Sequence, residues 1–140
     1  MIWTDDWLLG HGSMDTCHEE FVQTIARLQA TRDDALIEAY PDLLMHLESH
    51  FDAENKLMVE TDFPPRQCHI DEHNAVLNSV RQVAVELQEG NTALCRRLLD
   101  ELSRWFPKHT HQLDSALAHW DAKSRLGGKA VIIKRNVLKG

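Results

Sequence analysis

The sequence predicts an all-α protein, an up-down-up-down antiparallel four-helix bundle with an N-terminal arm and a short C-terminal tail. Apolar residues recur at alternating steps of three and four along four long segments, the pattern of a helix that buries one face. Proline and glycine are sparse, at four and six of 140 residues, and no strand-like alternation persists beyond a few residues. Short turns between such helices favour an antiparallel bundle.

Length and charge indicate one acidic domain with a basic end. We assign residues 1–122 to the bundle with its arm and residues 123–140 to a basic tail whose apolar stretch, 130–133, is expected to dock on the bundle. The formal net charge of −7 combines +6 in the tail with −13 in the bundle. An acidic body disfavours nucleic acid as a partner. The chain has no run of ~20 apolar residues and no basic secretory start, so we expect a cytoplasmic protein without membrane insertion.

The first two helices follow an extended arm in which Trp3 and Trp7 are expected to pack on the bundle. The first helix should begin near Ser13, a residue type that caps helix N-termini. The second is expected to be kinked or restarted at Pro41, because proline cannot continue the backbone hydrogen-bond ladder. It should then continue to about Glu60.

The last two helices are separated from the first pair by the clearest break in the chain, Asp-Phe-Pro-Pro at residues 62–65. The third helix should run from about Arg66 to Glu89. The fourth should begin after Gly90-Asn91-Thr92 and extend to about Ala122, since glycine and asparagine there suit a helix end and a new N-cap.

The three cysteines are Cys17, Cys68 and Cys95. Their odd number and their spacing match no disulfide or zinc framework, so we expect free thiols in a reducing compartment. We interpret Cys17 and Cys68 as small buried side chains rather than redox groups.

Each predicted helix carries ionisable residues where its apolar stripe would otherwise continue. They are His18 on the first helix, His50 and Glu54 on the second, His69 and His73 on the third, and His109 with Asp114 on the fourth. Buried ionisable groups are costly unless they are compensated, and no internal network would satisfy five imidazoles and two carboxylates without a cation. One tetrahedral zinc would use four of them, whereas two metal ions bridged by the carboxylates would use all seven.

The fourth helix leaves two alternatives open. His109 and Asp114 are five residues apart, about 140° around an ideal helix, whereas His111 and Asp114 are three apart, about 60°. Geometry alone therefore selects His111. A local widening of the helix would instead bring His109 and Asp114 to one side, and Pro107 is a physical cause of irregularity because it leaves the carbonyl of Ser103 without its helical donor.

Taken together, these motifs resemble those of the hemerythrins, especially the single-domain bacteriohemerythrins. The matching pieces are Met14-Asp15-x-x-His18, His50-Phe51-x-x-Glu54, His69-x-x-x-His73 and Trp105-x-x-x-His109-x-x-x-x-Asp114. The resemblance covers residues 3 to about 121 and includes all seven candidate ligands.

The resemblance implies a di-iron centre with an oxo or hydroxo bridge. His69, His73 and His109 would bind one iron, and His18 and His50 the other. Glu54 and Asp114 would bridge the two ions. The second iron would be five-coordinate, with an open position for dioxygen. The resemblance thus selects His109 over His111.

The implied function is reversible dioxygen binding for delivery, storage or sensing, with no catalytic residue. A di-iron enzyme that reduces peroxide or nitric oxide, with His111 as proton donor, is an alternative, and so is a protein that handles iron or another metal. Dioxygen is the expected small-molecule partner, alongside a protein that receives the oxygen or a signalling partner. Outward apolar residues are too scattered to indicate an interface, so a monomer is expected.

Five residues are candidates for the wall of an oxygen pocket, because each lies beside a candidate ligand. They are Phe21, Phe51, Trp105, Phe106 and Thr110. Plain core packing explains the aromatic residues equally well. The family usually has an apolar residue where this chain has Thr110, which would make the pocket wetter. The remaining histidines, His11, His46, His111 and His119, are expected to form hydrogen bonds rather than bind metal.

Overall fold

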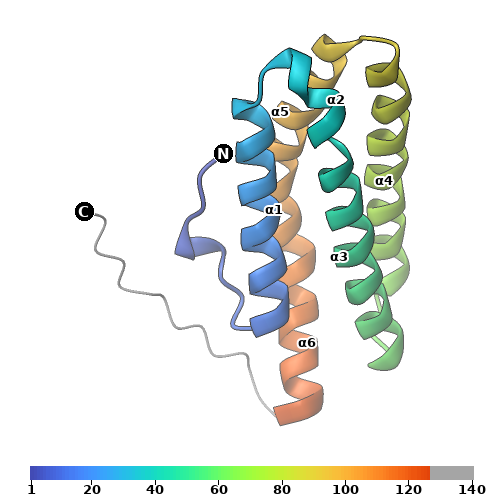
Figure 1. Cartoon of the computed structure of the whole chain (residues 1–140). Coiled ribbons are helices and arrows are strands. Elements are labelled where there is room, and N and C mark those ends of the chain that lie inside the picture. Colours follow the sequence, from blue (N-terminus) through green and yellow to red (C-terminus); the bar gives the residue numbers. More distant parts are fainter. Residues whose placement is uncertain (127–140) are drawn as a thin grey trace, which may run out of the picture.

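The protein is an antiparallel bundle of four long helical segments, as a computed structural model that describes residues 1–126 shows (Figure 1). The first three segments are α1 (Gly12–Ala30), α3 (Pro41–Glu60), which the short α2 (Leu36–Ala39) precedes, and α4 (Arg66–Gln88). The fourth is a continuous column of α5 (Thr92–His109), a π-helical turn (Thr110–Asp114) and α6 (Ser115–Leu126). Because α1 and α4 each pack against α3 and α5, the predicted up-down-up-down bundle is confirmed.

The N-terminal arm packs along this bundle, as the sequence predicted. The Trp7 ring meets Phe106 edge-on with centroids 5.3 Å apart, and Trp3 meets Trp7 at 5.6 Å. The arm is not fully extended, because it contains a short 3-10 turn at Asp5–Trp7.

The start of α1 is fixed by two side chains. His11, rather than the expected Ser13, is the N-cap, and its Nδ1 accepts the backbone N–H of Met14 at 3.3 Å. The Asp15 carboxylate accepts the backbone N–H groups of residues 9–11 at 2.8, 3.1 and 3.2 Å. The bond to Met14 satisfies an N–H group that the first turn of a helix leaves without a partner, and the bonds to Asp15 fix the preceding loop against α1.

The second helix restarts at Pro41 instead of bending through it. α2 ends at Ala39 and α3 begins at Pro41, where the missing N–H of proline costs no helical hydrogen bond. The intervening Tyr40 is buried, and its hydroxyl donates to the backbone carbonyl of Val80 on α4 at 2.7 Å. The restart therefore also anchors α3 to its neighbour.

The core consists of two apolar clusters with a polar layer between them. The larger cluster fills the half of the bundle nearer the α1–α2 turn, and its largest members include Phe21, Ile25, Tyr40, Leu43, Phe51, Leu99 and Phe106. The smaller cluster comprises Leu9, Met14, Met58, Phe63, Leu117 and Ala118. All seven candidate ligands are buried in the layer between the two clusters.

Details of the predicted ends and cysteines differ from the structure. α6 continues to Leu126, past the expected end at Ala122, and the predicted docking of residues 130–133 lies outside the described residues. The cysteines are free, but Cys68 is exposed, so the prediction that it is buried was wrong. Within residues 1–126 no helix is long and apolar enough to cross a membrane.

Candidate metal centre

The seven candidate ligands converge from all four helical segments into one site. Each is at most 5% exposed to solvent. They form two overlapping groups whose ligand atoms lie within 4.8 Å of one another. One consists of Glu54, His69, His73, His109 and Asp114, and the other of His18, His50 and Glu54. The structure thus brings together every residue that the sequence placed in the site.

The three-histidine group, His69, His73 and His109, faces one oxygen of each carboxylate. The Nε2 atoms of His69 and His109 lie 2.9 and 3.1 Å from Oδ1 of Asp114. The Nε2 atoms of His73 and His69 lie 3.2 and 3.5 Å from Oε1 of Glu54. Among residues 1–126 none of these three nitrogens and two oxygens has a hydrogen bond of good angular geometry despite the short distances, although buried polar atoms rarely lack one.

The two-histidine group, His18 and His50, faces the other oxygen of each carboxylate. His50 Nε2 lies 2.6 Å and His18 Nε2 3.3 Å from Oε2 of Glu54. His18 Nε2 also lies 3.0 Å from Oδ2 of Asp114. Each carboxylate therefore presents one oxygen to each histidine group, which is the donor arrangement that suits two cations joined by carboxylate bridges.

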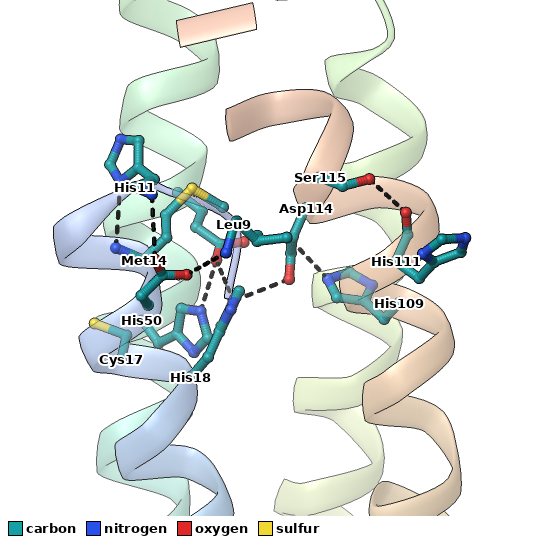
Figure 2. A network of polar contacts seen from close by, with 12 residues as sticks. Leu9, His11, Met14, Cys17, His18, His50, His109, His111, Asp114 and Ser115 are labelled. Atoms are coloured by element: carbon teal, nitrogen blue, oxygen red, sulfur yellow. Dashed lines mark hydrogen bonds and ion pairs between the residues drawn. The ribbon is translucent and has the colours of Figure 1, made fainter. Parts of the chain in front are cut away.

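The π-helical turn decides between His109 and His111. It widens the helix over Thr110–Asp114, and the Ser115 N–H bonds to the Thr110 carbonyl in the five-residue pattern of a π-helix. His109 and Asp114 are both buried and point inward, while His111 is exposed and turned away from them (Figure 2). The structure therefore favours His109 over His111, the residue that ideal-helix spacing alone would select.

Two partners of the three-histidine group were missed in the sequence. Glu72 Oε1 accepts hydrogen bonds from His109 Nδ1 at 2.9 Å and from the indole N–H of Trp105 at 2.8 Å. Asn55 Oδ1 lies 2.8 Å from His73 Nδ1. Such bonds fix ring orientation and direct Nε2 toward a metal ion. Glu72 and Asn55 directly neighbour His73 and Glu54 in the sequence, but both lie outside the apolar stripes that guided the search.

The two carboxylates keep protons on two histidines when no metal ion is bound. Burial opposes the charged form of His18, but hydrogen bonds and negative charge from Asp114 and Glu54 outweigh it and raise the pKa of His18 to about 10. The same balance raises the pKa of His69 to about 9. Metal binding must displace these protons, because only neutral imidazole binds a metal ion.

The carboxylates themselves stay ionised. Burial would raise the pKa of Glu54, but the charge of His50 and the hydrogen bonds from His18, His50 and His69 lower it well below its usual range. Burial and the charge of Glu54 act likewise on Asp114, whose pKa is nevertheless lowered by hydrogen bonds from His109, His18 and His69. The centre therefore offers two anionic bridges to a cation.

Aromatic rings cover the side of the centre that faces the larger apolar cluster. Phe51 stacks on His73 with centroids 4.0 Å apart, and Trp105 stacks on His109 at 4.4 Å. Phe106 meets His18 edge-on at 5.4 Å. A further ring, Phe21, stacks on Phe106 at 4.9 Å.

Thr110 is buried beside His109, and its hydroxyl has no hydrogen-bond partner among residues 1–126. All five residues predicted to line an oxygen pocket thus lie in or directly around the layer of ligands. Their role in binding oxygen stays a prediction.

The other histidines lie outside the two ligand groups. His46 Nε2 lies 3.1 Å from the backbone carbonyl of Cys17, and His11 Nε2 lies 2.8 Å from Asp121. His111 and His119 are exposed. Burial and the charges of Glu20 and Glu54 raise the pKa of the Cys17 thiol, which keeps it protonated and weakly nucleophilic.

Comparison with known proteins gives a consistent result. The family model described as the hemerythrin HHE cation binding domain matches residues 10–120. The chain is 33% identical over 121 residues to a bacteriohemerythrin of Ralstonia nicotianae, covering 86% of this chain and 88% of the relative. It is 29% identical over 119 residues to a bacteriohemerythrin of Aquifex aeolicus, covering 79% and 88%.

A more distant relative is a myohemerythrin. The chain is 22% identical over 113 residues to a myohemerythrin of Riftia pachyptila, covering 81% of this chain and 87% of the relative. No solved structure gives a significant match.

Proposed function

The chain belongs to the hemerythrin family, and on that premise we propose that it binds dioxygen reversibly at a carboxylate-bridged di-iron centre. The three-histidine group would hold one iron and the two-histidine group the other. Glu54 and Asp114 would bridge the ions. A pair of ferrous ions supplies the two electrons that dioxygen takes up on binding and returns on release.

The division of oxygens between the two histidine groups is the observation that carries this proposal. Oε1 of Glu54 and Oδ1 of Asp114 face three imidazoles, whereas Oε2 and Oδ2 face two. One ion would therefore have five protein ligands and the other four. An exogenous ligand would bind where protein ligands are fewer.

The surroundings favour a carrier over an enzyme. Phe51, Phe106 and Trp105 pack directly on the ligand rings and would exclude water from the side on which they lie. His111, the proton donor that the enzymatic alternative invoked, is exposed and turned away from the ligand layer. Thr110 is the polar exception in this wall, and its free hydroxyl could donate to a bound ligand.

The test is to load the protein with ferrous iron under anaerobic conditions and to record iron content and the optical spectrum before and after exposure to air. Two iron ions per chain and a spectral change that reverses when oxygen is removed would support the carrier. Immediate irreversible oxidation would contradict it and favour the enzyme. One zinc ion per chain in purified protein would contradict the di-iron centre itself.

A further inference from the structure

A cleft in the described part of the protein borders the metal centre. It has a volume of about 560 Å³ and is bordered by the start of α1, the second half of α3 and by α6. His50 and Glu54 form part of its lining, but His18, His69, His73, His109 and Asp114 do not. The cleft thus reaches the two-histidine group and leaves the three-histidine group untouched.

Burial of the ligands agrees with this direction of approach. His50 is 5% exposed, the largest value among the seven ligands, whereas His18 and His73 are fully buried. On the opposite side, Phe51 and Trp105 lie flat on ligand rings. Two smaller pockets border Phe51 and Trp105 on that side, but none of the seven ligands lines either of them. The cleft is therefore the more direct approach from solvent.

One hydrogen-bonded cluster joins two walls of the cleft. His11 Nε2 and the Arg125 guanidinium both lie 2.8 Å from Oδ2 of Asp121 on α6. Since Nδ1 of His11 accepts the N–H of Met14, its Nε2 carries the proton and donates to Asp121. The contact therefore ties the first turn of α1 to α6 across the cleft.

Only one oxygen of Asp121 takes part in this cluster. The residue is 1% exposed, and among residues 1–126 its Oδ1 has no hydrogen-bond partner. A buried carboxylate oxygen without a partner is costly, so the position of Asp121 depends on the contacts of its Oδ2 with His11 and Arg125.

We propose that this cleft is the route by which dioxygen and small anions reach the iron that the two-histidine group would hold. The contact between His11 and Asp121 sets the width of the cleft. The inference rests on the proposed di-iron function. It assigns the cleft a kinetic role: a barrier on the path changes the rates of arrival and departure equally and leaves the equilibrium affinity unchanged.

Ala53→Trp tests the route. Ala53 is exposed on α3 and lines the cleft one residue before Glu54. Ala116→Trp is the matched control, because Ala116 is also exposed, lies two residues after Asp114 and does not line the cleft. The probe is azide, mixed rapidly with the iron-loaded, oxidised protein and followed by absorbance.

We expect Ala53→Trp to slow both azide association and azide dissociation about tenfold or more, because passage then waits on a side-chain opening. The dissociation constant should stay unchanged, and Ala116→Trp should behave as the unmodified protein. Unchanged rates, or an altered dissociation constant without slower rates, would overturn the proposal. If Ala53→Trp does not load iron, Ser13→Trp at the exposed start of α1 provides the same test from the opposite wall.

Asp121→Ala tests the contact across the cleft. Both azide rates should rise, again without a change in affinity, and unchanged rates would show that the contact does not set the width. The two proposals fail separately. An unmodified protein that does not load two irons or bind oxygen refutes the proposed function, whereas normal oxygen binding with Ala53→Trp rates unchanged refutes the route alone.

Discussion

The two histidine groups face the same pair of carboxylates, yet they are supported very differently. In the three-histidine group, His73 and His109 each have their outer nitrogen bonded, to Asn55 and Glu72, and each lies under an aromatic ring. Within the described residues the Nδ1 atoms of His18 and His50 have no partner, as is also true of His69 in the other group, and His50 borders a cleft. Under the proposed function, the better supported half would hold its metal ion firmly and the other would admit the exogenous ligand.

Removing a ligand from the supported half should have the largest effect. We expect His109→Ala to abolish two-iron loading, because the ion there would lose one of three imidazoles and Asp114 would lose a hydrogen-bond partner. His111→Ala is the matched control, since His111 lies in the π-helical turn that directly follows His109 but is exposed. Iron content per chain measures both. Loss of iron in His111→Ala instead would show that the turn places a different histidine in the centre.

Weakening the hydrogen bond to a ligand ring, without removing the ligand, should reduce iron binding by less. Glu72→Gln replaces the charged acceptor of His109 Nδ1 by a neutral one, and we expect iron affinity to fall about 10- to 100-fold. Trp105→Phe is the control, because it removes the other donor to Glu72 and leaves its bond to His109 intact.

Two measurements test Glu72→Gln: a chelator competition for the iron affinity, and the reduction potential of the bound iron. A purely structural defect would lower the affinity without the shift in potential that loss of a nearby negative charge causes. An affinity equal to that of the unmodified protein would show that the bond from Glu72 does not distinguish the two halves.

Most of this architecture was predictable from the sequence, but the residues that hold the ligand rings in place by hydrogen bonds were not. The ligands were predictable because an ionisable residue in an apolar stripe contradicts the pattern around it, as His50 and Glu54 do. Glu72 could not be found that way, because its side chain is 37% exposed and in sequence it looks like any surface acid. Its role depends on α5 bringing Trp105 and His109 beside it. Preferring His109 over His111 needed the family resemblance, because Pro107 indicated an irregular helix but did not specify a π-helical turn.

The two halves of the centre should respond alike to pH, because both contain histidines whose pKa is raised on folding. Each contains a histidine of strongly raised pKa, His18 at about 10 and His69 at about 9, and the pKa of His109 is, despite burial, raised as well by Asp114 and Glu72. A histidine whose pKa is raised on folding contributes stability that is complete below its unfolded pKa of about 6.5 and is lost as pH rises through the folded value. The metal-free protein should therefore be less stable at high pH than at neutral pH.

Urea unfolding measures this difference at about pH 7 and about pH 10.5, on the metal-free and iron-loaded protein. Iron replaces the protons on both histidines, so the loaded protein should lose less stability over the same interval. An equal loss in both forms would mean that the stabilising protons do not sit on the ligands.

The smallest effect is expected when the Thr110 hydroxyl is removed, and it should differ from the effect at an ordinary buried threonine. The Thr110 hydroxyl has no partner, so Thr110→Val should leave the free energy of unfolding unchanged or raise it by about 1 kcal/mol. Thr24 is the matched control, because it is also buried in a helix but donates to the Glu20 carbonyl at 2.8 Å. Thr24→Val should therefore destabilise the protein by about 1 kcal/mol.

Urea unfolding of the metal-free variants tests this pair, and the lifetime of the oxygenated protein tests what the hydroxyl does for the ligand. Removing a polar group from the wall should lengthen that lifetime if Thr110 draws water toward the centre. Destabilisation by Thr110→Val as large as that by Thr24→Val would show that the hydroxyl is engaged within the fold. The wall would then be as dry as its aromatic members suggest, leaving the cleft beside His50 as the side from which water reaches the iron.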